Sequence, residues 1–145
     1  MKVVFACGGT AGHINPAIAI AQILKKKHCN IEVIFFGRPN SLESDLIAKE
    51  GYRFISLEIE SFKSKLTVKN LLCAKKMLEA YKLAKSMLQE IHPDAVIGTG
   101  GYVCFPVLRA AISLKIPTAI HESNAIAGKS VRILSKKCNQ VWLGF

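Results

Sequence analysis

The sequence contains no apolar stretch approaching the roughly 20 residues that a membrane-spanning helix needs. Lys2 is followed by a strand-like pattern without a small-residue cleavage signal, so a signal peptide is not expected either. Acidic residues are scarce, with 10 Asp and Glu against 20 Lys and Arg. We therefore expect a cytosolic protein that favours an anionic partner.

Cysteines occur in no pattern typical of disulfides or metal ligands. There are 5 of them, an odd number, with wide spacing and no C-x-x-C pair. The sequence thus predicts neither a disulfide framework nor a metal site. The five cysteines are Cys7, Cys29, Cys73, Cys104 and Cys138, and most of them are expected to be small core residues.

The excess of positive charge is regional. Residues 1–60 hold seven Lys and Arg against six Asp and Glu, whereas residues 61–92 hold seven against two and residues 93–145 six against two. A basic field of this kind suits nucleic acid, anionic lipid or a phosphorylated substrate.

Strand and helix patterns alternate along the chain. With 145 residues, half of them hydrophobic, the chain fits one compact domain. Several strands are continuous apolar runs, which predicts an α/β fold with a parallel sheet covered by helices on both faces. The expected strands are 3–7, 31–36, 54–59, 95–98, 117–121 and 140–143, and the expected helices are about 15–27, 40–51, 67–91, 106–114 and 127–137.

The first expected strand runs into a glycine-rich loop. Gly8, Gly9 and Gly12 allow positive φ angles and a close approach of a ligand to the main chain. Asn15 is the expected cap of the helix that follows, and Pro16 suits its first turn. Free N–H groups at such a helix start predict a site for phosphate or diphosphate.

Two nucleotide-binding motifs are not favoured by the spacing. A dinucleotide fingerprint starting at Gly8 needs a glycine where Thr10 stands, and an acidic residue after the second strand, where Arg38 stands. A P-loop ending at Gly128-Lys129-Ser130 needs a glycine where Ser123 stands. An NTPase remains only a remote option.

Three loops each follow a strand of the expected parallel sheet, so all three are expected on one rim. Ligands of such sheets bind on that rim, outside the carboxyl ends of the strands. The loops are residues 8–17 (GGTAGHINPA), 98–103 (GTGGYV) and 121–128 (HESNAIAG). In order and spacing they resemble the motifs of the MurG family, the bacterial UDP-N-acetylglucosamine:N-acetylmuramyl-(pentapeptide) pyrophosphoryl-undecaprenol N-acetylglucosaminyltransferases. The resemblance covers essentially the whole chain, and the third motif is the most specific.

The resemblance implies the N-terminal half of a GT-B glycosyltransferase with a Rossmann-like sheet. It implies an inverting enzyme of peptidoglycan synthesis that needs no cofactor and acts peripherally at the cytoplasmic face of the bacterial inner membrane. The enzyme moves N-acetylglucosamine from UDP-N-acetylglucosamine to the 4-hydroxyl of an undecaprenyl-diphosphate-linked N-acetylmuramyl-pentapeptide. Members of the family are more than twice this length. Residues 1–145 are therefore expected to be the acceptor-side domain, inactive alone, with the donor-binding C-terminal domain absent from this chain.

The chain departs from the family pattern at three places. The family usually has Gly where this chain has Ala11, which restricts the backbone there. It usually has Gln at Ser123, and Ser-Gly where this chain has Cys104-Phe105. Phe105 is expected either to narrow the second loop or to enter the core.

The resemblance implies roles for residues of all three loops. His13 is a candidate general base that takes the proton of the acceptor hydroxyl, or a residue that only positions diphosphate. Asn124 matches a sugar-contacting Asn, and a turn-forming role is its alternative. His121 and Glu122 are expected to fix their loop. The other expected substrate contacts, for which a ligand-free turn is the alternative in the first loop, are Gly9, Thr10, Ala11, Gly12, Gly100, Gly101 and Tyr102.

A second unusual stretch places apolar residues among lysines. Helical spacing predicts a core-facing stripe on the longest helix, formed by Leu71, Ala74, Leu78, Tyr81, Leu88 and Ile91. Outside that stripe, an expected membrane patch comprises Phe62, Lys63, Lys65, Leu66 and Lys69, and possible exposure of Leu72 would extend it. Such a patch suits an anionic membrane surface, and an ordinary solvated lysine face is the alternative. Nucleic acid is not favoured, because aromatic residues for base stacking are missing.

Two other functions stay open at this point. The chain could be the acceptor or membrane-anchor subunit of a split glycosyltransferase, whose partner chain supplies the donor domain. It could also be a non-catalytic module that recruits an enzyme or a lipid-linked sugar to the membrane.

Overall fold

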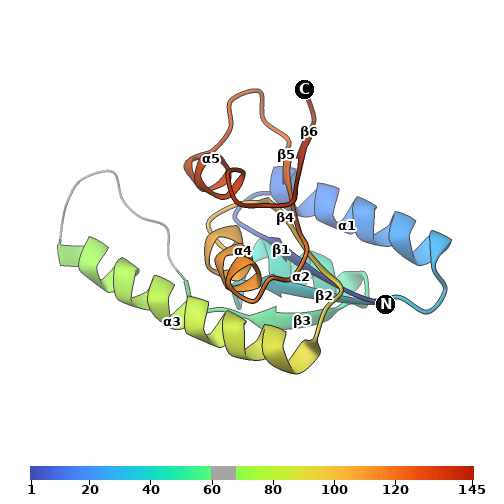
Figure 1. The fold of residues 1–145 in the computed structure, drawn as a ribbon, viewed down its shortest axis with the longest axis horizontal. Helices are drawn as coiled ribbons and strands as arrows, with labels where there is room; N and C mark the ends of the chain where they lie inside the picture. Colours follow the sequence, from blue (N-terminus) through green and yellow to red (C-terminus); the bar gives the residue numbers. More distant parts are fainter. Residues whose placement is uncertain (60–67) are drawn as a thin grey trace.

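The computed structural model describes residues 1–59 and 68–145, and of residues 68–70 the backbone alone. Over this part of the chain a parallel sheet with the strand order β3-β2-β1-β4-β5-β6 forms the centre of the molecule (Figure 1). The strands are β1 (Lys2–Cys7), β2 (Glu32–Gly37), β3 (Arg53–Ser56), β4 (Ala95–Gly100), β5 (Thr118–Glu122) and β6 (Gln140–Leu143).

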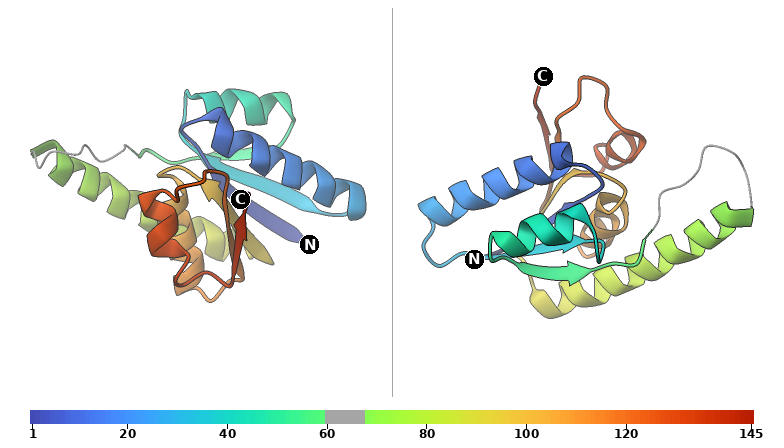
Figure 2. Two further views of the ribbon diagram at one scale, coloured as in Figure 1. Left: turned by 90° about the horizontal axis from the view of Figure 1, so that it is seen from above. Right: turned by 180° about the vertical axis from the view of Figure 1, so that it is seen from behind.

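Helices cover both faces of the sheet (Figures 1 and 2). Side chains of β1 alternate between two cores: Val4 and Ala6 pack with residues of α3, α4 and α5, whereas Val3 and Phe5 pack with residues of α1 and α2. The predicted α/β fold, a parallel sheet with helices on both faces, is confirmed. The helices are α1 (Ala11–Lys27), α2 (Leu42–Lys49), α3 (Val68–Ile91), α4 (Cys104–Ser113) and α5 (Lys129–Leu134).

The strand order reverses at β1, which pairs with β2 on one side and with β4 on the other. In doubly wound sheets ligands bind outside the carboxyl ends of the strands at this point. The glycine-rich loop after β1 and the loop after β4 flank it, and the loop after β5 lies next to them.

The start of α1 was predicted wrongly. The helix begins at Ala11 rather than near Asn15, and Thr10 is its N-cap, with an extended backbone and a carbonyl that accepts hydrogen bonds from the N–H groups of His13 and Ile14. Pro16 therefore lies inside the helix. Because Ala11 is the first helical residue and has no positive φ, alanine fits where the family has glycine. Gly12 is helical too, so only Gly9 of this loop takes a positive φ, 91°.

The stripe predicted on α3 is correct only for its C-terminal half. Leu88 and Ile91 are buried and Tyr81 packs against the core, but Leu71 is 74% exposed and Leu78 54% exposed. Ala74 is exposed as well. The first turns of α3 project beyond the described strands of the sheet, which agrees with the exposure of these side chains (Figure 1). Among the described residues, no helix has the length and apolar character to cross a membrane.

Candidate active site

The three predicted loops meet at the carboxyl edge of the sheet. The Thr99 hydroxyl donates to the His13 carbonyl at 2.6 Å, which joins the second loop to the first turn of α1. The Ser123 hydroxyl donates to the Gly12 carbonyl at 3.1 Å, which joins the third loop to the same turn. The prediction that these loops gather on one rim is confirmed.

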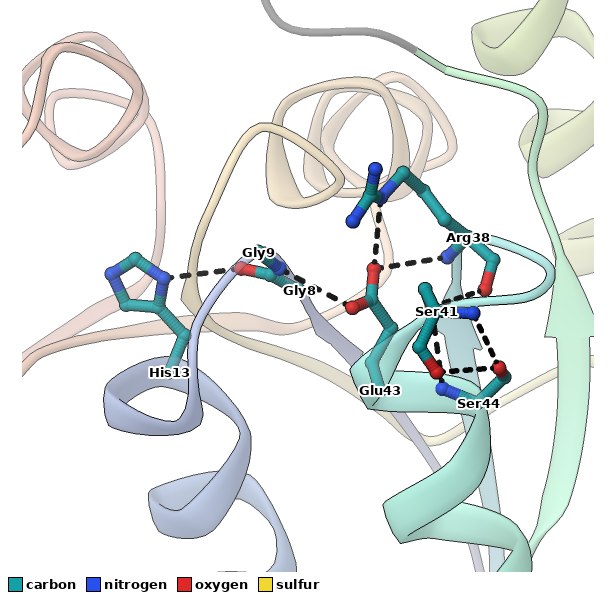
Figure 3. Close-up of polar contacts among 7 residues, drawn as sticks. All are labelled: Gly8, Gly9, His13, Arg38, Ser41, Glu43 and Ser44. Atoms are coloured by element: carbon teal, nitrogen blue, oxygen red, sulfur yellow. Dashed lines mark hydrogen bonds and ion pairs between the residues drawn. The ribbon is translucent and has the colours of Figure 1, made fainter.

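His13 is held at the centre of this rim by its Nδ1 atom. Nδ1 lies 3.1 Å from the Gly8 carbonyl oxygen and 3.3 Å from the Thr10 hydroxyl (Figure 3). A carbonyl oxygen can only accept, so the contact with Gly8 is a hydrogen bond in the tautomer that carries its proton on Nδ1, whereas the Thr10 hydroxyl can donate to Nδ1 or accept from it. Nε2 has no hydrogen-bond partner among the described residues. In the Nδ1–H tautomer Nε2 is the unprotonated nitrogen that a general base requires.

Glycines of the second loop let the main chain approach this ring closely. Gly100 and Gly101 have φ angles of 121° and 83°, which side chains disfavour. A Cβ atom on Gly100 would overlap the His13 ring, and one on Gly101 would overlap the Gly8 carbonyl oxygen. The close contact between the two loops thus requires glycine at both positions.

Glu43 lies buried beneath the glycine-rich loop, although the sequence predicted for it only a place in the helix at about residues 40–51. The capping box of α2 is formed by Ser41 and Ser44, which leaves the Glu43 carboxylate free to turn toward the loop (Figure 3). Its Oε2 accepts from Gly9 N at 3.4 Å. Its Oε1 accepts from Arg38 N at 3.3 Å and from Arg38 Nε at 3.2 Å.

The electrostatics of Glu43 favour the ionised carboxylate. Burial opposes ionisation, but hydrogen bonds from its own N–H and from the backbone and side chain of Arg38 lower the pKa of Glu43 below its ordinary value. In the sequence, the only indication of this contact is a carboxylate early in the helix that follows the second strand. Glu43 reaches Gly9 because β2, which precedes α2, lies beside β1, which precedes the glycine-rich loop.

Arg38 and Tyr102 form the wall of the rim beside Glu43. The guanidinium lies 5.4 Å from the centre of the Tyr102 ring, and Tyr102 itself comes from the second loop. Only Nε of Arg38 bonds to a carboxylate among the described residues, so its two Nη groups remain for other acceptors. Sequence analysis did not find this residue, because Arg38 was considered only as a mismatch to a dinucleotide motif.

The third loop is organised by Glu122, as predicted. Its Oε1 accepts from Asn124 N at 2.9 Å and from Asn124 Nδ2 at 2.7 Å, and its Oε2 accepts from Gly128 N at 3.0 Å. Burial opposes ionisation, yet these bonds and the nearby His13 lower the pKa of Glu122. The Nδ1 atom of His121 is buried without a hydrogen-bond partner among the described residues, so the expectation that His121 also fixes the loop stays a prediction. Asn124 is exposed, with its amide hydrogen committed and its Oδ1 oriented by that bond.

The simple anion cradle predicted from the glycines needs a correction. The N–H of Gly9 is committed to a carboxylate and is not a free donor. Ala11 and Gly12 are exposed residues in the first turn of α1, where the backbone N–H groups of a helix have no partner within the helix. Thr10 is also exposed, directly before them.

An apolar groove of about 670 Å³ opens next to this rim, between α3, α4 and α5. Phe105 and Tyr102 line it, so Phe105 faces the groove and packs against the edge of the core. Arg109 and Lys129 add positive charge to its lining. Of the predicted membrane patch, Phe62, Lys63, Lys65 and Leu66 lie outside the described residues, and Lys69 lies in α3 without a described side chain.

Comparison with known proteins places the chain among glycosyltransferases. Residues 3–143 match the model of the glycosyltransferase family 28 N-terminal domain. The UDP-N-acetylglucosamine--N-acetylmuramyl-(pentapeptide) pyrophosphoryl-undecaprenol N-acetylglucosamine transferase of Listeria welshimeri is 44% identical over 145 residues, which is 100% of this chain and 40% of that protein. This chain therefore spans about 40% of the length of the curated relatives it matches.

Solved structures give the same result. The crystal structure of Acinetobacter baumannii MurG superposes with a TM-score of 0.87 at 31% identity, over 99% of this chain and 41% of that one. A UDP-GlcNAc 2-epimerase from Methanocaldococcus jannaschii shares the fold alone, with a TM-score of 0.69 at 14% identity over 99% of this chain and 39% of the epimerase. The resemblance to the MurG family, and to the N-terminal half of a GT-B enzyme, is confirmed.

Proposed function

Because this chain belongs to glycosyltransferase family 28, we propose that it forms the acceptor-side domain of an inverting N-acetylglucosaminyltransferase of peptidoglycan synthesis. The donor is UDP-N-acetylglucosamine and the acceptor is the undecaprenyl-diphosphate-linked N-acetylmuramyl-pentapeptide. The observation that carries the proposal is the position of His13, whose Nδ1 lies 3.1 Å from the Gly8 carbonyl oxygen on the rim where three loops meet, which leaves Nε2 available to the acceptor hydroxyl.

In the proposed reaction His13 Nε2 takes the proton of the acceptor 4-hydroxyl. The hydroxyl oxygen attacks the anomeric carbon of N-acetylglucosamine, and the bond from that carbon to the UDP oxygen breaks, so UDP leaves with the electron pair. Attack opposite the leaving group inverts the configuration. The proton ends on the imidazole, where Glu122 stabilises the positive charge through its proximity to His13.

Binding of the acceptor diphosphate is proposed at the start of α1. The N–H groups of the exposed residues Ala11 and Gly12 lie at the positive end of the helix dipole. Arg38, on the other side of the Gly8–Gly9 turn, offers two Nη groups for charge-assisted bonds. Asn124 Oδ1 and the rim residues Gly9, Thr10, Gly100, Gly101 and Tyr102 remain the proposed sugar and diphosphate contacts.

A membrane-facing surface is proposed at the projecting end of α3. Leu71, Leu72 and Leu78 are 74%, 52% and 54% exposed, and they lie along one apolar depression with Lys75. Exposed leucines beside lysines suit the boundary of an anionic bilayer. This surface adjoins the groove that leads to Tyr102, so a lipid-linked acceptor could reach the rim from the membrane. The proposed location is the cytoplasmic face of the inner membrane.

The test restores a complete enzyme. Residues 1–145 are joined to the C-terminal remainder of the Listeria welshimeri transferase, and transfer of labelled N-acetylglucosamine to the lipid-linked acceptor is measured. His13→Ala is expected to lower kcat by about 10²- to 10⁴-fold with a smaller change in KM. His28→Ala, at the other end of α1, is the matched control and keeps the activity.

Three outcomes separate the alternatives. A folded chimera without transfer activity overturns the proposal. Activity when the two parts are supplied as separate chains favours a split transferase. Binding of the lipid-linked acceptor without turnover favours a recruitment module.

The His13→Ala variant tests the role of this residue separately. An unchanged kcat in His13→Ala would leave His13 only the role of positioning diphosphate.

A further inference from the structure

We propose that Glu43 is a positioning residue for His13 and acts through the single peptide group that joins Gly8 to Gly9. The inference rests on the proposed role of His13 as a base. It adds to the site a residue of α2, which lies on the far side of the glycine-rich loop from the histidine (Figure 3).

Both side chains bind opposite ends of the same peptide group. Its carbonyl oxygen, on Gly8, accepts from His13 Nδ1 at 3.1 Å. Its N–H, on Gly9, donates to Glu43 Oε2 at 3.4 Å. The C=O and N–H bonds of a trans peptide point in opposite directions, so the group connects the imidazole with the carboxylate in one chain of hydrogen bonds.

Glycines make this arrangement sterically possible. A Cβ atom on Gly8 would lie 2.7 Å from Glu43 Oε1. A Cβ on Gly101 would overlap the Gly8 carbonyl oxygen, and one on Gly100 would overlap the His13 ring. The peptide group is therefore enclosed by the carboxylate on one side and the second loop on the other, which restricts its rotation.

A negative charge at the N–H end polarises the peptide. Glu43 has no exposed side-chain surface, so water screens its charge little. Its carboxylate makes the Gly8 oxygen a stronger acceptor for the proton on His13 Nδ1. The consequence is an imidazole held as the Nδ1–H tautomer, with the lone pair on Nε2 directed to the rim. Arg38 balances the charge of Glu43 from the opposite side.

One other carboxylate of the described residues interacts with His13. Glu122, at the end of β5, acts on the ring by charge, while its oxygens bond to Asn124 and Gly128. It can favour the protonated ring but makes no hydrogen bond that selects a tautomer. The tautomer of neutral His13 is therefore the readout that separates Glu43 from Glu122.

The experiment is ¹⁵N NMR of the histidine rings in the 145-residue chain, between pH 5 and 9. In the unaltered chain the neutral His13 ring is expected as the Nδ1–H tautomer. In Glu43→Gln the Nε2–H tautomer becomes populated, and the ring loses about threefold in proton affinity. Ser44→Ala is the matched control, because it removes the capping box of α2 and leaves the carboxylate in place.

A second variant covers the case in which Glu43→Gln does not fold. Arg38→Gln removes the balancing charge, so the proton affinity of the His13 ring is expected to rise rather than fall. An unchanged tautomer and titration in a folded Glu43→Gln chain overturns the inference, as does an unchanged titration in Arg38→Gln. Neither measurement depends on turnover. If the 145-residue chain shows the expected NMR change and the chimera is inactive, the proposed function is rejected and the link between Glu43 and His13 stands.

Discussion

The Ser123 hydroxyl donates to the Gly12 carbonyl oxygen at 3.1 Å, the oxygen that the main chain of α1 leaves without its usual partner. In an α-helix that oxygen would accept from the N–H of the residue four positions later. Here that residue is Pro16, which has no N–H. Pro16 thus leaves the Gly12 carbonyl oxygen available on the rim, and the hydrogen bond from Ser123 to this oxygen connects the third loop to the first.

This relationship predicts energetic coupling between Ser123 and Pro16. Ser123→Ala is expected to cost about 1 kcal/mol of unfolding free energy, because it removes this hydrogen bond between the third loop and α1. In a Pro16→Ala background the restored helix N–H pairs with that carbonyl, so the same change is expected to cost less than half as much. Urea unfolding of the four chains gives the coupling energy. Equal costs in both backgrounds would show that the two residues act independently.

The contact of Gly101 with the Gly8 carbonyl makes a second prediction. Gly101→Ala combines a positive φ with a steric overlap and is expected to destabilise the chain by about 2 kcal/mol or more. Gly12→Ala is the matched control, since Gly12 is helical and its nearest neighbour to a new Cβ is 3.7 Å away. That control is expected to be neutral or to stabilise by up to about 1 kcal/mol in urea unfolding. A similar loss in both variants would contradict this account.

The sheet, its two covered faces and the gathering of the loops could be predicted, because strand and helix periodicities are local and parallel strands end at one edge. The start of α1 could not. Gly12 disfavours a helix locally, and the first turn is stabilised instead by bonds from Thr99 and Ser123, which come from distant loops. The contact between Glu43 and Gly9 was missed for a similar reason, since it depends on β2 lying beside β1.

Periodicity also failed on the first half of α3. The spacing of Leu71 and Leu78 correctly identifies one face of a helix, but it contains no information about how far the sheet extends beneath that face. The error is informative, because the exposed leucines form an apolar surface, and the vesicle experiment below tests whether it is a binding surface.

Acid is expected to destabilise the chain partly through Glu43. Its pKa is lowered in the folded state, so its bonds to Gly9 and Arg38 stabilise the fold fully above the unfolded pKa of about 4.3. This contribution is lost as pH falls through the lower folded pKa. Glu43→Gln is expected to flatten the dependence of unfolding free energy on pH below about 4.5. The measurement is urea unfolding from pH 3 to 7, and an unchanged slope would reject the assignment.

Cysteine reactivity should follow burial. The Cys104 Sγ lies within hydrogen-bond distance of the Ala6 and Gly100 carbonyl oxygens, to either of which its single proton can be donated, and burial raises its pKa to about 12. Cys29 is exposed. At pH 8 iodoacetamide is expected to modify Cys29 at least tenfold faster than Cys104, because only the thiolate reacts. Mass spectrometry of the alkylated chain measures both rates, and in urea the difference should vanish. Rapid native modification of Cys104 would show that the second loop opens.

Vesicle binding tests the exposed end of α3. Leu71→Ser with Leu78→Ser removes two apolar side chains that together contribute about 2 kcal/mol or more when buried in a bilayer boundary, so retention on anionic vesicles should fall by at least tenfold. Leu83→Ser is the matched control, because Leu83 is an exposed leucine of the same helix that lies outside the groove lining. Salt screens the attraction of Lys65 and Lys69 to anionic lipid, and replacing these two lysines removes it. Both changes are therefore expected to weaken binding. Equal retention of the double variant and the Leu83 control would mean that this leucine surface does not face the membrane.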